Sequence, residues 1–259
     1  MTNQKKTRQK ERRQAMRYNI IATGSKGNCA LATFSDGKKV LFDFGKGCFK
    51  KCTDAGLVLN SVDKILISHA HNDHIGDVHI VPHLLEKRAS LDFFNFSLTH
   101  NIENQGFIVT NVITKEVFYY LTDFYDIPQE SMRLISETLQ FFNEKNYKIM
   151  FVMELSYCKH LYEKLDDLHK IGLSHHLSDV EFFKYAKIFK AQAPNVNFIT
   201  THASQRGDYS QEQKGWNGTV CPPDWVKIQL FNRLGNARFG EAFGMSKTYH
   251  YIEHKFKGN

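Results

Sequence analysis

Short apolar runs separated by polar turns occupy the first half of the chain, which is the pattern of β-strands. Asp36 and Gly37 separate two of these runs and predict a type I′ hairpin turn. The apolar runs predict strands at 18–22, 29–34, 39–44, 64–68, 94–99, 106–114 and 116–121. We therefore expect the first half of the chain to be mostly β-structure.

Helical signals join the strands in the second half. Pro128 suits the first turn of a helix, and Asp126 lies near its N-cap position. Ser178 and Glu181 have the S-x-x-E spacing of a capping box, which predicts that another helix begins there. The apolar residues that follow have the spacing of one buried helix face, at Phe182, Ala186, Phe189 and Ala193. The other elements predicted in this half are helices at 128–145 and 156–170 and strands at 149–153 and 196–201.

Two β-rich blocks, each followed by helices, predict a single α/β domain, an αββα sandwich of two packed sheets with helices on the outer faces. Of the 259 residues, 42% are hydrophobic and 24% are charged, which excludes a disordered chain, a collagen and a coiled coil. No apolar run is long enough for a membrane span, and no apolar segment of a signal peptide follows the basic N-terminus. Five scattered cysteines, an odd number, indicate reduced thiols and a cytoplasmic location.

The net charge of +7 is concentrated at the N-terminus. Residues 1–17 contain seven of the 34 Lys and Arg residues and one of the 27 Asp and Glu residues, a net charge of +6. The rest of the chain, with 27 cations against 26 acids, is nearly neutral. We therefore predict a basic tail at 1–17 and one domain at 18–259. A basic arm can hold phosphate backbones without reading sequence, and the alternative is a tail that is only solvated.

The strongest chemical signal is the segment Ser68-His69-Ala70-His71-Asn72-Asp73-His74, which follows a predicted buried strand. Successive side chains on a strand alternate, so His69 and His71 can point to one side as the chain leaves the sheet. Asp73 and His74 come after a bend and point elsewhere. Imidazoles and a carboxylate at this spacing are typical metal ligands, and the arrangement suits two neighbouring metals.

This H-x-H-x-D-H segment resembles the signature of the metallo-β-lactamase fold superfamily, and other motifs similar to that family follow in order between residues 20 and 204. The matching positions are the G-S-K-G-N loop at 24–28, the D-x-G element at 43–45, His100, Asp123, Glu154, the H-L-S element at 176–178 and the T-H-A-S element at 201–204. Departures at Asn101, Ser156, Cys158 and His175 leave the subfamily and substrate open and remove no metal ligand. The resemblance is nearest to the YycJ-like branch, which is similar to tRNase Z.

The resemblance implies a dinuclear metal site braced by Asp43. The implied ligands are His69, His71 and His100 for the first metal, Asp73, His74 and His202 for the second, and Asp123 as a bridge between them. Imidazoles and carboxylates without a thiolate suit two Zn²⁺ ions, with Mn²⁺ as the alternative. Two such ions leave the site positively charged, which favours an anionic substrate.

The implied function is a metal-dependent phosphodiesterase, a nuclease acting on DNA or RNA through a hydroxide that two metals activate. The close alternative is a cyclic nucleotide phosphodiesterase of the same fold, because the body outside the tail is neutral. An alternative from another class is a binding protein on an inactive scaffold. Such scaffolds normally lose ligands, and here every ligand position is filled.

Four further residues are expected to take part in catalysis or substrate binding. Asp73 and His176 are expected to be catalytic, His176 by giving a proton to the leaving group; the alternatives are that His176 only caps the following helix or that His175 gives the proton. Ser204 and Arg206 follow the last ligand and are expected to bind the substrate phosphate, with a structural ion pair as the alternative for Arg206. Aromatic residues near the C-terminus are expected to pack onto the body or to form a homodimer face.

Overall fold

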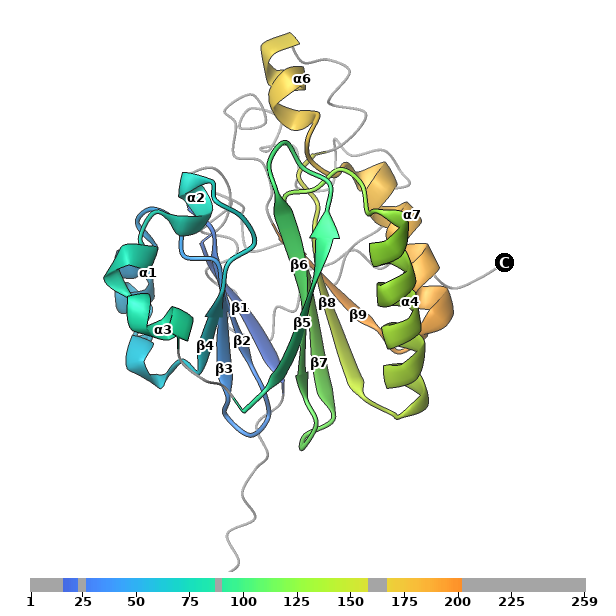
Figure 1. Cartoon of the computed structure of the whole chain (residues 1–259), viewed down its shortest axis with the longest axis horizontal. Coiled ribbons are helices and arrows are strands. Elements are labelled where there is room, and N and C mark those ends of the chain that lie inside the picture. The colour runs from blue at the N-terminus through green and yellow to red at the C-terminus, as the bar shows by residue number, and fades with distance from the viewer. Residues whose placement is uncertain (1–15, 23–26, 87–89, 158–166, 202–259) are drawn as a thin grey trace, which may run out of the picture.

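Two β-sheets lie face to face at the centre of the protein, and helices cover their outer faces (Figure 1). The computed structural model describes residues 16–22, 27–86, 90–157 and 167–201. One sheet has the strand order β1-β2-β3-β4 and the other the order β5-β6-β7-β8-β9. The pairs β3–β4, β7–β8 and β8–β9 are parallel and the remaining pairs are antiparallel, so both sheets are mixed. The predicted αββα architecture is confirmed.

The strands and helices have the following bounds. The strands are β1 (Arg17–Ala22), β2 (Cys29–Thr33), β3 (Lys39–Phe42), β4 (Lys64–Leu66), β5 (Asp92–Leu98), β6 (Asn104–Asn111), β7 (Glu116–Leu121), β8 (Lys148–Glu154) and β9 (Asn197–Thr201). The helices are α1 (Cys48–Asp54), α2 (Asn72–Ile75), α3 (Pro82–Glu86), α4 (Gln129–Glu144), α6 (Asp167–Leu173) and α7 (Asp179–Gln192), with 3₁₀ turns η1 (Leu59–Ser61) and η2 (Val78–Ile80).

The central strands β6, β7 and β8 of the second sheet are buried on both faces, which explains their nearly continuous apolar sequences, whereas β5 is largely exposed. In β7, Val117, Tyr119 and Leu121 pack toward α4 and α7, while Phe118 and Tyr120 pack against the first sheet. The apolar face predicted for α7 is buried in the same layer, at Phe182, Ala186, Phe189 and Ala193. A third cluster fills the space between the first sheet and α1 and α3. Strand alternation thus places each side chain in one of two apolar layers.

The β2–β3 hairpin differs from the predicted type I′ turn, which requires positive φ at both Asp36 and Gly37. Only Gly37 has positive φ, at 91°. The Gly37 N–H donates to Phe34 O and the Phe34 N–H donates to Lys38 O, both at 2.9 Å, so a type I turn is followed by a glycine bulge. Asp36 is held by Asn111 Nδ2, which donates to its Oδ2 at 2.8 Å. This contact ties the turn to β6 of the second sheet.

Two helix predictions near Ser178 also need correction. The predicted helix at 156–170 does not include Ser156, whose N–H donates to Leu177 O at 3.0 Å. Residues 158–166 lie outside the described residues, and α6 covers Asp167–Leu173. Ser178 is the N-cap of α7, but its hydroxyl donates to the Glu181 carboxylate instead of capping a backbone N–H, so the capping box is not formed. At Ser156 a backbone hydrogen bond to Leu177 replaces the predicted helical conformation. At Ser178 a side-chain hydrogen bond replaces the predicted cap.

The N-terminal segment enters the first sheet earlier than predicted. Met16 is buried and Arg17 pairs with Thr33 as the first residue of β1, while residues 1–15 lie outside the described residues. None of the helices in the described part of the chain has the length and hydropathy needed to cross a bilayer.

Candidate metal centre

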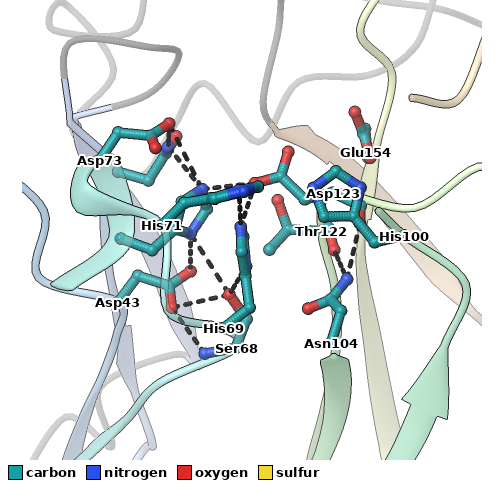
Figure 2. Close-up of polar contacts among 12 residues, drawn as sticks. Asp43, Ser68, His69, His71, Asp73, His100, Asn104, Thr122, Asp123 and Glu154 are labelled. Carbon is teal, nitrogen blue, oxygen red and sulfur yellow. Dashed lines mark hydrogen bonds and ion pairs between the residues drawn. The ribbon is translucent and has the colours of Figure 1, made fainter. Parts of the chain in front are cut away.

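Three imidazoles meet where β4 and β5 end (Figure 2). His69 and His71 follow β4, and His69 Nε2 lies 2.9 Å from His71 Nδ1. His100 comes from the segment after β5, and its ring centroid is 5.2 Å from each of the other two. One nitrogen from each residue lies within 4.8 Å of the others, a spacing that a single ion can bridge. The structure therefore brings together the three residues predicted to bind the first metal.

Asp123, at the end of β7, lies between these imidazoles and His74. Its Oδ2 is 2.5 Å from His74 Nε2 and 3.3 Å from His69 Nε2, and all three residues are buried. Asp73 is more exposed, with its Oδ2 3.6 Å from His74 Nε2. The position of Asp123 fits a carboxylate shared by two ions. His202, Ser204 and Arg206, by contrast, are among the residues the structure does not describe.

Asp43, directly after β3, ties the metal loop to both sheets. Its Oδ1 accepts hydrogen bonds from the Ser68 N–H at 2.8 Å and the Ser68 hydroxyl at 2.9 Å. Its Oδ2 accepts one from the Tyr120 hydroxyl at 2.8 Å and lies 2.9 Å from His74 Nδ1. Burial alone would raise the pKa of Asp43, but the charge and hydrogen bonds of His74 outweigh burial and lower it. Asp43 is therefore charged, with both carboxylate oxygens in hydrogen bonds, and can orient His74.

The turn at Gly45 packs directly against the loop that carries Asp73. A Cβ atom at Gly45 would lie 1.7 Å from Asp73 O, so only glycine fits there. The neighbouring Asn28 N–H donates to Asp73 O at 2.6 Å, and Asn28 Nδ2 donates to Asp73 Oδ2 at 3.1 Å. Asn28 Nδ2 also lies 2.8 Å from His74 Nε2. Asn28, the last residue of the motif at 24–28, thus supports the acidic end of the metal loop, while residues 24–26 lie outside the described residues.

The charges of the centre suit cation binding. Burial, together with the nearby His74 charge, lowers the pKa of His69 to about 3, so its imidazole is neutral near pH 7. Burial also acts to lower the pKa of His74, but the carboxylates of Asp123 and Asp43 outweigh it and raise that pKa to about 10. A proton on His74 thus offsets part of the negative charge of the two carboxylates, and a divalent ion bound in its place would offset more of it.

One buried nitrogen gives an independent test of whether a metal fits. His100 Nδ1 lies 3.1 Å from the backbone oxygen of His175, which can only accept, so Nδ1 carries the proton and Nε2 carries the lone pair. His100 Nε2 is buried and has no hydrogen-bond partner within the described part of the chain. Burial lowers the pKa of His100, which keeps this lone pair available. An orphaned, neutral imidazole nitrogen facing two others is the arrangement expected of a metal ligand.

Asn104 holds Asp123 in an unusual backbone conformation. Asp123 has φ of 51°, in the left-handed region that costs free energy for residues other than glycine. Buried Asn104, at the start of β6, donates through Nδ2 to Thr122 O at 2.9 Å and to Asp123 O at 2.6 Å (Figure 2). No motif in the sequence indicated this role. Asn104 is therefore a positioning residue for the predicted bridging carboxylate.

Replacing Asn104 with alanine is expected to weaken metal binding by roughly 10–100-fold, the usual cost of losing a group that orients a ligand. Asn111→Ala is the matched control because Asn111 is also buried in β6 and donates to Asp36 at the hairpin. Both changes should lower stability by about 1–3 kcal/mol. Competition with a chelator measures affinity and thermal unfolding measures stability. Equal metal affinities in the two variants would contradict the role given to Asn104.

His176 and Glu154 form a pair beside the centre that the sequence only partly predicted. Glu154 is buried at the end of β8 and accepts hydrogen bonds from the Phe124 N–H at 2.7 Å and from the Ser156 hydroxyl. His176 Nδ1 lies 2.7 Å from Glu154 Oε1 and 3.2 Å from Asp123 Oδ1. The His176 ring centroid is 5.5 Å from that of His100. The structure thus brings the predicted catalytic histidine to the cluster and adds Glu154 as its contact.

Four supporting residues were not assigned roles from the sequence. Asn28 and Glu154 lie inside recognised motifs, so the sequence contained a signal from which their supporting roles could have been predicted. Asn104 and Tyr120 lie outside any motif and act through contacts between strands, which no local pattern encodes.

A segment near the N-terminus, about a quarter of the chain, is similar to phage proteins. Residues 21–85 match the family model described as Anti-Pycsar protein Apyc1. The Anti-Pycsar protein Apyc1 of Bacillus phage vB_BveM-Goe7 is 44% identical over 63 residues, which are 22% of this chain and 24% of that protein. Exodeoxyribonuclease YycJ of Bacillus anthracis is 26% identical over 156 residues, 55% of each chain. The chain therefore matches only part of the length of these curated relatives.

Solved structures resemble a larger part of the chain. The metallo-β-lactamase fold protein YhfI from Bacillus subtilis has a TM-score of 0.51 at 15% identity, covering 79% of this chain and 92% of its own. Human tRNase Z, short form, has a TM-score of 0.51 at 15% identity, covering 74% and 94%. Unliganded yeast PDE1 has a TM-score of 0.52 at 11% identity, covering 73% and 88%. At these identities the likeness concerns the fold.

Proposed function

The chain has the metallo-β-lactamase fold, and on that premise we propose that it is a metal-dependent phosphodiesterase that cleaves DNA or RNA. The observation that carries the proposal is the meeting of His69, His71, His74, His100 and Asp123 from three separate strand ends. The match to an exodeoxyribonuclease over 55% of the chain supports a nucleic-acid substrate. The basic N-terminal segment supports the same substrate class.

The donor set favours an anionic substrate. The positive charge of two divalent ions on these ligands exceeds the negative charge of Asp73 and Asp123. The loaded centre is therefore positive and attracts a phosphodiester. When bound, such ions lower the pKa of water and stabilise the oxygens around phosphorus in an in-line displacement. His69, His71 and His100 would hold one ion, and His74, Asp73 and undescribed His202 the other. Zn²⁺ suits these donors, with Mn²⁺ as the alternative.

The protein residues then position groups and move protons. Asp43 and Asn28 orient His74 and Asp73, and Asn104 orients Asp123. Asp73 is the most exposed carboxylate of the cluster, with a side-chain exposure of 25% against 2% for Asp123, so it can accept a proton at the solvent side. Glu154 accepts from His176 Nδ1, which leaves Nε2 as the atom that gives a proton to the leaving oxygen.

A cyclic nucleotide phosphodiesterase is the second candidate. The chain outside residues 1–17 is nearly neutral, which suits a small nucleotide better than a long polyanion. The family-model match at residues 21–85 is consistent with this candidate.

A substrate panel tests the proposal. Protein loaded with Zn²⁺ or Mn²⁺ is incubated with 5′-labelled DNA and RNA and with cyclic mononucleotides, and EDTA-treated protein is the control. We expect metal-dependent cleavage of the labelled strands. Cleavage of cyclic mononucleotides alone would establish the second candidate, and no cleavage of any substrate together with only trace bound metal would reject both.

The basic N-terminal segment provides a further prediction. Residues 2–15 carry six cations and one acid and precede buried Met16, so they can be removed without touching β1. The deletion should weaken binding to DNA and RNA and flatten its salt dependence, because fewer counterions are released. Hydrolysis of bis-p-nitrophenyl phosphate should stay the same. Replacing the six cations with glutamine should reproduce the deletion, and an unchanged salt slope in both variants would contradict the prediction.

A further inference from the structure

An exposed aromatic ring lies beside the candidate metal centre. Tyr125 is 40% exposed although its neighbour Phe124 is completely buried, so the chain presents this ring to solvent two residues after Asp123. Leaving an aromatic ring in water forgoes the free energy that burial would supply. Neither the metal cluster nor the proton-transfer pair uses Tyr125.

The backbone around Tyr125 is firmly held. Its N–H donates to Thr99 O at 3.1 Å, and the Thr99 N–H donates to Asp126 O at 3.1 Å, so a short antiparallel bridge joins the two loops. Thr99 directly precedes His100. The Phe124 N–H, on the other side, donates to Glu154 Oε2 at 2.7 Å. Tyr125 is therefore fixed between the loop that carries His100 and the carboxylate that contacts His176.

The rings form a continuous path from the centre to solvent. The His100 and His175 ring centroids are 6.2 Å apart at an interplanar angle of 88°. The His175 and Tyr125 ring centroids are 6.0 Å apart at 56°. His175 is half-buried and Tyr125 is the outermost ring of the three. A planar ligand joined to a phosphate at the centre would meet this aromatic edge first.

We propose that Tyr125 and His175 form a base subsite, in which the nucleobase next to the bound phosphate stacks on the exposed face of Tyr125. The inference rests on the proposed phosphodiesterase function and narrows its substrates to esters that carry a nucleobase. Aromatic stacking accepts any base because every base has a π-face, so the subsite gives affinity without sequence preference. A sugar phosphate lacking a base would forgo this contact.

The probes are nucleoside 5′-monophosphates and ribose 5-phosphate, which has the same sugar and phosphate without a base. Calorimetric titration of the full-length metal-loaded protein should show the nucleotides binding roughly 5- to 150-fold more tightly than ribose 5-phosphate. Tyr125→Ala should remove this preference and leave the affinity for ribose 5-phosphate unchanged. Tyr125→Phe should preserve the preference, because phenylalanine keeps the ring.

Phe141→Ala is the matched control for exposure, since Phe141 is 51% exposed near the far end of α4. This variant should keep the preference for nucleotides. Equal binding of nucleotides and ribose 5-phosphate by the unmodified protein would overturn the base subsite alone, as would a full preference in Tyr125→Ala. Binding of neither probe would reject the phosphodiesterase proposal, and the subsite with it.

Discussion

Asp123→Asn is expected to reduce the bound metal from about two ions to at most one per chain, and to lower hydrolysis by roughly 10³-fold, which corresponds to several kcal/mol of lost charge stabilisation. The carboxylate lies within 3.3 Å of both His69 and His74, so one charge is placed to serve two ions. An amide has nearly the same shape and lacks the charge. Asparagine also tolerates the left-handed φ of this position, so the backbone should be retained.

Elemental analysis of protein purified without chelator measures the first effect and steady-state kinetics the second. Asp126→Asn is the matched control, because Asp126 is on the same loop but contacts the Tyr185 hydroxyl instead of the cluster. The control should keep both ions and its activity. Two ions per chain in Asp123→Asn would show that the carboxylate does not bridge, and trace metal in the unmodified protein would reject the dinuclear centre.

His176→Ala is expected to lower kcat by roughly 10²–10⁴-fold on substrates with poor leaving groups, while the fold and both metals are retained. A poor leaving group needs a proton as its bond breaks, and an imidazole can supply one near neutral pH. Bis-p-nitrophenyl phosphate releases a stable anion that needs little protonation. Its hydrolysis should therefore fall much less than cleavage of DNA or RNA.

Two variants separate proton transfer from a structural role of His176. His176→Gln can still donate a hydrogen bond toward Glu154 but is no general acid, so it should be as slow as His176→Ala on nucleic acid. His83→Ala, at an exposed histidine of α3, should leave both activities unchanged. Recovery of activity in His176→Gln would mean that the residue only positions its neighbours. Equal losses on both substrates, or loss of metal, would also reject the role as acid.

Local sequence patterns were sufficient to predict the strand-rich first half, the buried face of α7 and the loop after β4 that carries His69 and His71. The reason is that each depends on neighbours within a few positions, through strand alternation or helical periodicity. His69 and His71 lie two positions apart after β4, so their proximity depends little on the rest of the chain. The order of the remaining motifs identified the fold, although spacing alone could not show which of them meet.

Tertiary structure decided how distant residues support this loop. Asn104 reaches Asp123 across the β6–β7 register, 19 positions away, and His176 reaches Glu154 from 22 positions away. The left-handed φ of Asp123 likewise occurs together with the contact from Asn104 on β6, and Asn111 on the same strand contacts Asp36 at the hairpin turn. These contacts arise because the strand ends of β7, β8 and β9 lie side by side. The parallel pairing of these strands and the packing of the two sheets decide which ends meet. No short-range sequence pattern contains that information.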